Sequence, residues 1–534
     1  MTDVKQIILA ILILSISISS NGKNYTSGGV YDVHKYGAIG DGVTDDAAKI
    51  QKAIDAASRN GGGKVLIKNG TFLISTIILK SNIELYLAGN AILLGYPKDF
   101  RKYFKDDFFL YKKMSRALIY ANGATNIAIK GDGKIDGQGK SFSLDSDRPN
   151  NIFFRSCKGV QIEGVSMVNA GCFNCWLIEC ENVRINRVRI ENLAQHNNDA
   201  LDLDACKDVM ISNSYFHSLD DCITLKSTIP GSACRDIIIT NCNFSTKCAA
   251  IRIGPDAYGN IENVAVSNCV IRNTLQGGIK IQQSFGGTMQ NMTFSDIVMD
   301  NVVCPIVIRV AGWQEITKGM KNTGLVDVFD DSKWESGKVQ NISFSNIVGT
   351  VPKIAPKHAS QAKCIQITGT TKTRPRNISF NNINIRFSGG GTEIMGARRD
   401  VPDLPRNYPE IGIFGILPAY GLYAHHASDI ILNNVQFRLD TVDMCPAIVC
   451  NDVENLEISG FKAEGNERAE SLIRLEDTRN VLITSSRTLN MTGSFLRVEG
   501  TLSEDILLQN NKLNLAKKIF DISDNVNKGA VIIK

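Results

Sequence analysis

The sequence is poor in proline and has no marked excess of either charge. Its 534 residues include 13 prolines and 45 glycines, a composition that argues against a fibrous or low-complexity chain. Lys and Arg total 59 against 54 Asp and Glu, and a net charge of +5 over this length disfavours nucleic-acid binding. Because 43% of the residues are hydrophobic, the chain has enough apolar material for a large globular core.

Long hydrophobic runs are absent after the N-terminal segment. There, an apolar run from Ile7 to about Ile18 follows Lys5 and ends at small polar residues. Such a run is short for a transmembrane helix and is typical of a secretory signal. We therefore predict a signal peptide over residues 1–22, a secreted or periplasmic protein, and no membrane association after cleavage. An uncleaved anchor is the alternative.

Paired C-x-x-C modules with metal-binding spacing are also missing, although the chain has 14 cysteines. Export normally predicts disulfides. However, Cys180, Cys206 and Cys234 share one phase of the repeat described below. We therefore interpret most of the cysteines as stacked, buried thiols. No metal and no cofactor is expected.

A repeat of 26 to 28 residues dominates the sequence. Its equivalent apolar residues are Val183, Val209, Ile237, Val264 and Met292, and weaker copies begin at Asn341, Asn377, Asp429, Asn455 and Asn480. Each copy places two short alternating strands around a bend that contains Asn or Asp. One copy is too short to bury its own apolar face, so successive coils must stack. Leucine-rich repeats and propeller blades do not fit this spacing.

The predicted fold is all-β: a single-stranded, right-handed parallel β-helix that forms one continuous domain. Residues 23–120 would form an entry region, 121–460 the central β-helix with the active site, and 461–534 the C-terminal coils and cap. The amphipathic stretch 45–58, with Thr44 as a possible N-cap, is predicted to be a helix that closes the N-terminal end. Two insertions, 314–338 and 389–426, interrupt the repeat and are candidate binding surfaces.

Alignment of the inward aliphatic residues places the residues between them in two outward columns. The first column is Asp202, Thr224, Arg252, Lys280 and Val307. The second column is Asp204, Lys226, Gly254, Gln282 and Arg309. At the preceding bends lie Asp199 in one coil and Asp220 and Asp221 in the next. We expect all of these residues to share one surface.

Clustered carboxylates of this kind suit glycoside hydrolysis. Like charges one strand apart disfavour joint ionisation, which raises the pKa of at least one carboxyl group. Hydrolysis of a glycosidic bond needs one carboxylic acid to protonate the leaving oxygen and one carboxylate to activate water. From the pattern alone, two other interpretations stay open: the aspartates are bend formers, or they bind calcium.

At these residues the chain resembles glycoside hydrolase family 28, the polygalacturonase and rhamnogalacturonase group of β-helices. The sharpest similarities are NNDALD from Asn197 to the family's NTDGxD, and Asp220-Asp221-Cys222 with Lys226-Ser227 to its DDC and the strand that follows. The entry region is similar in YDVHKYGAIGDGVTDDAAKIQKAIDAA from Tyr31 and GGGKVLIKNGTFL from Gly61. A segment common in bacterial members is similar to VPDLPRNYPEIGIFGILPAYGLYAHHASDI from Val401.

The resemblance implies roles for the matching residues. Asp220 would be the general acid, and Asp199 and Asp221 would activate water for a single displacement with inversion. Asn197 would orient this group, and Asp202 would support it or contact substrate. The substrate would be a polysaccharide or oligosaccharide, pectic or related and acidic. The oligomeric state is not predicted.

The chain departs from the family at two motifs. The histidine of the family's GHG motif aligns with Ala249, and the RIK motif becomes Lys280-Ile281-Gln282. In the family those cations hold a galacturonate carboxylate, so plain polygalacturonate is an unsafe assignment of the substrate. His196 or His217 could replace the missing imidazole, but ordinary bend or solvent positions are the alternative.

A basic patch is predicted to compensate for the altered motif. It consists of Arg252, Lys280 and Arg309, and it could still hold a carboxylate, since Arg binds carboxylates in bidentate geometry. The alternative is that Arg252 pairs with the nearby aspartates. Lys226 and Gln282 complete the predicted substrate-binding set.

Two other functions remain open. In a lyase on the same scaffold, the aspartates would bind calcium, and Lys226, Arg252 or Lys280 would remove a proton next to a uronate carboxylate. The second alternative is a non-catalytic glycan-binding β-helix, which the missing histidine favours.

The long insertions favour exo over endo action. Aromatic residues within them, such as Tyr408 and Phe414, either stack on sugar rings or pack the loops.

Overall fold

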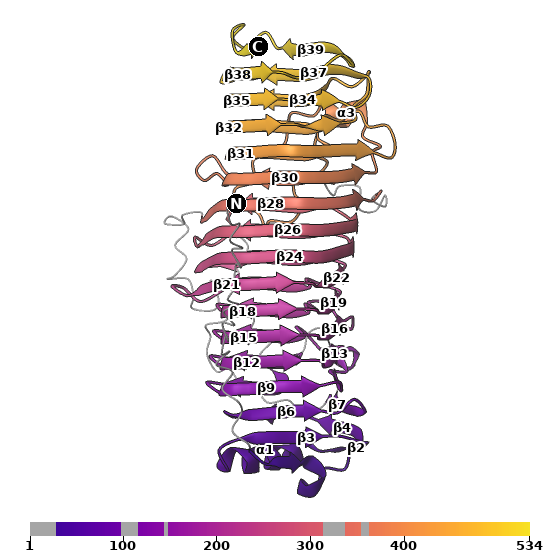
Figure 1. Ribbon diagram of the computed structural model, residues 1–534, viewed down its shortest axis with the longest axis vertical. Coiled ribbons are helices and arrows are strands. Elements are labelled where there is room, and N and C mark those ends of the chain that lie inside the picture. The colour runs from indigo at the N-terminus through magenta and orange to yellow at the C-terminus, as the bar shows by residue number, and fades with distance from the viewer. Residues whose placement is uncertain (1–27, 98–115, 144–147, 313–336, 354–362) are drawn as a thin grey trace, which may run out of the picture.

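The computed structural model describes residues 28–97, 116–143, 148–312, 337–353 and 363–534. Its strands stack coil upon coil along one long axis, from α1 (Ala47–Arg59) at one end to the C-terminal strands at the other (Figure 1). Strands of neighbouring coils pair in parallel. The predicted all-β, right-handed parallel β-helix is therefore confirmed.

One ladder of strands carries the acidic residues, and we call it the site ladder. It consists of β8 (Ala117–Asn122), β11 (Asn150–Arg155), β14 (Cys175–Ile178), β17 (Leu201–Asp204), β20 (Ile223–Ser227), β23 (Ala249–Ala257), β25 (Gly277–Gln283), β27 (Ile306–Val310) and β29 (Ile365–Thr368). A second ladder contains β9 (Thr125–Gly131), β12 (Lys158–Glu163), β15 (Glu181–Asn186), β18 (Lys207–Ser212) and β21 (Ala233–Thr240). A third contains β10 (Lys134–Asp136), β13 (Ser166–Val168), β16 (Arg189–Asn192), β19 (Tyr215–Ser218) and β22 (Asn243–Thr246).

The remaining elements extend the same solenoid toward both ends. Long strands that run through the bend are β24 (Asn260–Thr274), β26 (Thr288–Val302), β28 (Lys338–Val351), β30 (Arg376–Phe387) and β31 (Leu422–Leu439). The N-terminal coils contain β1 (Val30–Asp32), β2 (Asp41–Asp45), β3 (Gly63–Ile67), β4 (Gly70–Ile74), β5 (Ile77–Ile78), β6 (Ile83–Leu87) and β7 (Ala91–Gly95). The C-terminal coils contain β32 (Ile448–Ser459), β33 (Lys462–Ala463), β34 (Ser471–Glu476), β35 (Arg479–Thr484), β36 (Arg487–Thr488), β37 (Thr492–Glu499), β38 (Glu504–Gln509), β39 (Ala516–Ile522) and β40 (Val531–Ile533). Short helices are η1 (Val33–Tyr36), η3 (Gly139–Ser141) and α3 (Glu393–Gly396).

The spacing of the repeat matches the register of the sheet. Val183 lies opposite Val209, and Val209 lies opposite Ile237. Ile237 pairs in turn with Val264, and Val264 with Met292. The weaker copies continue the same row at Ile342, Ile378, Ile430, Leu456 and Val481. Because adjacent strands lie about 4.8 Å apart, residues one repeat apart become neighbours.

The bends depend on asparagine. Asn263, Asn291 and Asn341 have φ of 58°, 57° and 57°, a left-handed conformation that Asn adopts more readily than most residues. Their side chains also form a ladder: Nδ2 of Asn291 donates to Oδ1 of Asn263 at 3.2 Å, and Nδ2 of Asn341 donates to Oδ1 of Asn291 at 3.3 Å. The repeated asparagines are therefore bend and ladder residues, as predicted.

The interior is a continuous apolar stack. The rings of Phe294, Phe344 and Phe380 are buried and nearly parallel, with centroids 5.0 and 5.1 Å apart. All 14 cysteines are buried and free, which confirms their interpretation as core thiols. Burial of this kind stabilises the solenoid because each coil covers the apolar face of the next.

The N-terminal end is closed by α1, as predicted. Its apolar residues Ile50, Ala53, Ile54 and Ala57 are fully buried against the first coils. The predicted N-cap is wrong, because β2 extends to Asp45 and the helix begins only at Ala47. The hydroxyl of Thr44 instead donates to Oδ2 of Asp41 at 2.9 Å.

Some predictions fall on residues outside the described ranges. These include the signal peptide 1–22 and most of the 314–338 insertion. The boundaries at residues 120 and 460 stay a prediction. None of the helices in the described ranges has the length and apolar character that crossing a membrane would require.

Phe344→Ala should destabilise the protein by about 3–5 kcal/mol, because it removes the middle ring of a close-packed stack and leaves a cavity. Val348→Ala on the same strand is the matched control, since Val348 is 46% exposed and its loss should cost less than about 0.5 kcal/mol. Urea unfolding followed by circular dichroism measures both. Equal effects of the two substitutions would contradict the role assigned to the stack.

Candidate active site

Register in the site ladder brings polar residues of adjacent coils together. Asp202 on β17 lies opposite Thr224 on β20. Thr224 lies opposite Arg252 on β23, and Arg252 lies opposite Lys280 on β25. The first predicted column is therefore present. It runs from the coils that carry the aspartates to the two coils that carry Arg252 and Lys280.

The second predicted column has an irregularity at Gly254. The register between β20 and β23 shifts after Leu225. Gly254 has φ of 84°, and a Cβ there would lie 2.1 Å from the carbonyl oxygen of Gln282. Gly254 therefore does not occupy a regular outward position, and the prediction that it does is wrong, because the strand bends where two backbones approach closely. Regular pairing resumes in the next coil, where Gln282 lies opposite Arg309.

Asn198 holds the bend that carries Asp199. Its amide oxygen accepts hydrogen bonds from the backbone N–H of Ala194, at 2.8 Å, and of Gln195. Its Nδ2 donates to the carbonyl oxygen of Cys172 at 2.7 Å. Because Asn198 is fully buried and bonded at both ends of its amide, it fixes the position of the neighbouring carboxyl group.

Asp220 and Asp221 lie one coil further, just before β20. The carboxylate of Asp221 is buried and accepts hydrogen bonds from the backbone N–H of Ala249 at 3.0 Å and from Nη1 of Arg252 at 3.2 Å. The N–H of Ala200 donates to the carbonyl oxygen of Asp221 at 3.0 Å, which ties the two bends together. Asp220 is half-buried and is the most accessible of the three predicted catalytic residues.

Burial and mutual repulsion raise the pKa values of these carboxyl groups. Burial raises the pKa of Asp199 well above its ordinary value, and the charges of Asp202 and Asp220 add to the rise. Burial and the charge of Asp221 raise the pKa of Asp220, although Arg252 opposes them. The cluster therefore retains a proton at pH values at which an isolated aspartic acid is ionised.

Asp202 and Lys226 bind each other inside the site ladder. Nζ of Lys226 lies 2.8 Å from Oδ1 of Asp202, and the side chains are 5% and 0% exposed. Burial raises the pKa of Asp202 to about 6, and Lys226 limits the rise. Nζ of Lys226 also lies 4.4 Å from the ring centroid of Phe173. Contact of either residue with substrate stays a prediction.

A loop from the second insertion lies on the predicted basic patch. Nη2 of Arg252 donates to the hydroxyl oxygen of Tyr408 at 2.8 Å and to Oε1 of Glu410 at 3.2 Å. Nζ of Lys280 donates to Oε2 of Glu410 at 2.8 Å. Burial opposes ionisation of Glu410, but the charges of Lys280 and Arg252 outweigh it and lower its pKa to about 2. The carboxylate on these two cations therefore belongs to the chain itself.

Gln282 and Arg309 hold the backbone of the same loop. Nε2 of Gln282 donates to the carbonyl oxygen of Pro409, and Nη2 of Arg309 donates to that of Leu404 at 2.5 Å. The guanidinium of Arg309 lies 4.7 Å from the ring centroid of Phe414. Arg309 is thus bound to the loop and not to the carboxylate on the other two cations of the patch, and its contact with substrate stays a prediction.

Asn197 and the two histidines lie at the edge of the cluster. Oδ1 of Asn197 accepts a hydrogen bond from Nη2 of Arg148 at 3.2 Å, and its role in orienting the aspartates stays a prediction. His196 is exposed, and its charge is one of the influences that lower the pKa of Asp220. His217 lies on β19 in the third ladder.

Sequence reasoning missed Glu410, Asn198 and Arg148. Glu410 lies in the segment from Val401, whose sequence shows a resemblance to bacterial proteins but no repeat that would place it. The available signal was an acidic residue in an insertion together with Arg252 in an outward column that contains a second cation, Lys280. Ala249 contributes its backbone N–H, so the position that lacks the family's histidine still bonds Asp221.

Asp220, Asp221 and Cys248 place two carboxylate oxygens and a sulfur within 4.8 Å of one another. Metal ligation by cysteine requires a thiolate. Burial and the charge of Asp221 raise the pKa of Cys248 well above its ordinary value, so the thiol is protonated when no metal is bound. The absence of a metal requirement stays a prediction.

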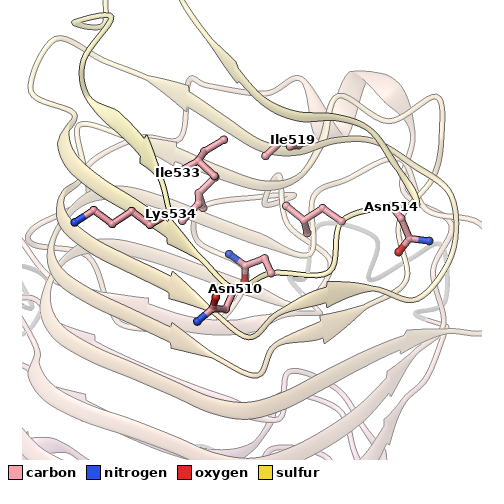
Figure 2. A pocket seen from close by; sticks show the side chains of 8 residues that line it. Asn510, Asn514, Ile519, Ile533 and Lys534 are labelled. Carbon is pink, nitrogen blue, oxygen red and sulfur yellow. The ribbon is translucent and has the colours of Figure 1, made fainter.

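A separate pocket of about 380 Å³ lies at the C-terminal end of the solenoid (Figure 2). It is lined by Leu508, Asn510, Asn511, Leu513, Asn514, Ile519, Ile533 and Lys534. This lining has one ionisable side chain, Lys534, and therefore offers no carboxyl pair for hydrolysis. We assign the candidate active site to Asp199, Asp220 and Asp221.

Comparisons with known proteins concern the family and the fold of the chain, and the roles of the three aspartates stay a prediction. The model of glycosyl hydrolases family 28 matches residues 103–399. A probable polygalacturonase of Arabidopsis thaliana is 30% identical over 335 residues, which are 61% of this chain and 69% of that protein. The exopolygalacturonase of Thermotoga maritima superposes with a TM-score of 0.55 at 22% identity, over 67% of this chain and 87% of that one. The family 28 exopolygalacturonase of Yersinia enterocolitica superposes with a TM-score of 0.53 at 18% identity, over 89% of this chain and 78% of that one. At these identities the two structures support the fold alone.

Asp202→Asn should destabilise the protein by about 3–5 kcal/mol, because it leaves the buried ammonium of Lys226 without its counter-charge. The double variant Asp202→Asn/Lys226→Met removes both charges and should recover part of that loss. Midpoints of urea unfolding measure the two effects. A single variant as stable as the wild type would mean that the pair does not support the site ladder.

Proposed function

We propose that this chain, which belongs to glycosyl hydrolases family 28, hydrolyses O-glycosidic bonds in pectic or related acidic polysaccharides or oligosaccharides. One observation carries the proposal: the bends of adjacent coils bring together Asp199, Asp220 and Asp221, and the pKa of Asp220 is raised while its side chain stays accessible. A protonated carboxyl group next to a held carboxylate is the arrangement that glycosidic hydrolysis requires.

Asp220 is assigned as the general acid. Its half-buried side chain can approach a glycosidic oxygen, whereas Asp199 and Asp221 are 5% and 3% exposed. Its raised pKa keeps the proton that the leaving oxygen must receive. As the C–O bond breaks, the proton moves from Asp220 to that oxygen, and Asp220 becomes a carboxylate.

Asp199 and Asp221 are assigned to the water that attacks the sugar. Asp221 is held as an acceptor by the N–H of Ala249 and the guanidinium of Arg252, which fixes its direction. Water attacks the anomeric carbon from the face opposite the leaving group and gives a proton to the carboxylate of Asp221, which inverts that carbon in one displacement. Asn197 is assigned to orienting this group through its contact with Arg148.

The names of the relatives support the substrate class. The Arabidopsis thaliana protein is called a probable polygalacturonase, and both superposed bacterial enzymes are called exopolygalacturonases. We propose exo action on a pectic chain for this protein as well. We also propose that it is exported by its N-terminal segment and works outside the cytoplasm, with no nucleic-acid partner.

The lyase alternative is less well supported. A lyase needs an unprotonated base near the substrate. Lys280 is fully buried, and although burial opposes its charge, Glu410 raises its pKa overall, so it is a poor proton acceptor. A lyase would form an unsaturated product that absorbs ultraviolet light, and a chelator would stop its formation.

Asp220→Asn should lower kcat by about 10²- to 10⁴-fold, because the amide cannot donate the proton that the leaving oxygen needs. Release of reducing ends from a panel of pectic polysaccharides measures the effect. Asp236→Asn is the matched control: Asp236 lies at a bend with φ of 60°, where several other coils, such as those of Asn263 and Asn291, carry asparagine. Full activity in Asp220→Asn, or equal loss in both variants, would overturn the assignment.

The rate should decrease as pH rises, because the general acid must be protonated. Since the pKa of Asp220 is raised, the alkaline limb of kcat/KM should lie above the ordinary aspartic acid value of 3.8. Arg252 lowers the pKa of Asp220, so Arg252→Gln should move that limb to higher pH, whatever its effect on the maximal rate. A limb that stays in place or moves to lower pH would contradict this electrostatic account.

A further inference from the structure

Glu410 occupies the place where a substrate carboxylate would have to bind. Its two carboxylate oxygens are divided between two cations of adjacent coils: Oε1 accepts from Arg252 at 3.2 Å, and Oε2 accepts from Lys280 at 2.8 Å. The side chains of Arg252 and Lys280 are 6% and 0% exposed, whereas that of Glu410 is 29% exposed. The cations therefore present no open face to a second carboxylate.

The charges at this position are already balanced. Arg252 and Lys280 supply two positive charges, and Asp221 and Glu410 supply two negative ones, with contacts of 3.2 Å or less. A sugar carboxylate that entered here would meet the exposed part of Glu410 without a free counter-charge. Burying an unpaired charge is strongly unfavourable, so the position repels an ionised uronate.

The loop that carries Glu410 is fastened on both sides. Before Glu410, the carbonyl oxygens of Leu404 and Pro409 accept hydrogen bonds from Arg309 and Gln282. After it, the side chain of Ile411 is buried in a small apolar cluster. Displacement of Glu410 by a substrate would break these contacts, so the loop forms a fixed wall of the site.

Glu410 lies beyond residues 103–399, the part of the chain that the family model matches. The cations that it covers, Arg252 and Lys280, lie inside that part. The loop therefore brings a carboxylate from outside the matched part onto two cations within it.

We propose that Glu410 is a specificity-determining residue that makes the Arg252–Lys280 subsite select a sugar unit without an ionised carboxylate, a neutral sugar or an esterified uronate. This inference rests on the proposed hydrolase function and narrows its substrate class. The exposed carboxylate of Glu410 would accept hydrogen bonds from the hydroxyl groups of a sugar ring and would repel an ionised carboxylate, whereas a neutral sugar or an ester carries no charge to repel.

The first test compares kcat/KM for methyl-esterified and de-esterified polygalacturonate of equal chain length. The wild type should prefer the ester at least tenfold. In Glu410→Gln the two cations lose their counter-charge and should attract the ionised polymer, so the preference should fall at least tenfold. Glu393→Gln is the matched control: it removes an acidic residue from the same insertion whose side chain is 64% exposed and pairs with Arg468. Wild-type preference for the ionised polymer would overturn the proposal, and this result needs no variant.

The second test does not depend on catalysis. Free galacturonate should raise the thermal unfolding midpoint of Glu410→Gln, because it replaces the missing carboxylate, but it should leave the wild type unchanged. Its methyl ester, which carries no charge, should not stabilise the variant more than the wild type. Equal stabilisation of wild type and variant by galacturonate would show that Glu410 is a displaceable plug and would overturn the proposal. If the wild type hydrolyses no pectic substrate, the proposed function fails, while this second test still decides the role of Glu410.

Discussion

The parallel register between coils is the constraint on which the whole structure depends. Each backbone hydrogen bond between β17, β20, β23 and β25 fixes which side chains of successive coils become neighbours. The repeat holds this register through inward aliphatic residues and through asparagine ladders at the bends. Because side chains alternate across a strand, a slip of one residue would turn the acidic column into the core. Stability and chemistry therefore rest on the same pairing.

The site is a gradient of charge along the solenoid. Carboxyl groups on two coils are followed by cations on the next two, and the loop that carries Glu410 closes the basic end. Burial raises the pKa of Asp199 and Asp220, whereas the cations keep Glu410 ionised. Carboxyl groups that lie a few coils apart therefore differ in protonation, because their neighbours carry charges of opposite sign. This difference lets Asp220 act as the proton donor while Glu410 stays ionised and bound to the cations.

Much of the fold could be predicted because the β-helix is locally periodic. The in-phase residues from Val183 to Val481, the buried cysteines and the capping helix follow from spacing and hydrophobicity alone. Thr44 and Gly254 were misplaced because their positions depend on where a strand ends and where two backbones approach, which periodicity does not encode. Glu410 could not be placed for a related reason: it lies in a non-repeating insertion and meets Arg252 across 158 residues of chain. Nothing in the local sequence specifies that contact.

A crystal structure of the Asp220→Asn variant with a bound pectic oligosaccharide would test the central claim most directly. The account predicts a glycosidic oxygen within hydrogen-bonding distance of residue 220, a water molecule between the sugar and the carboxyl groups of Asp199 and Asp221, and Glu410 still bound to Arg252 and Lys280. An oligosaccharide that binds away from these three positions, or three aspartates without access to the sugar, would contradict it.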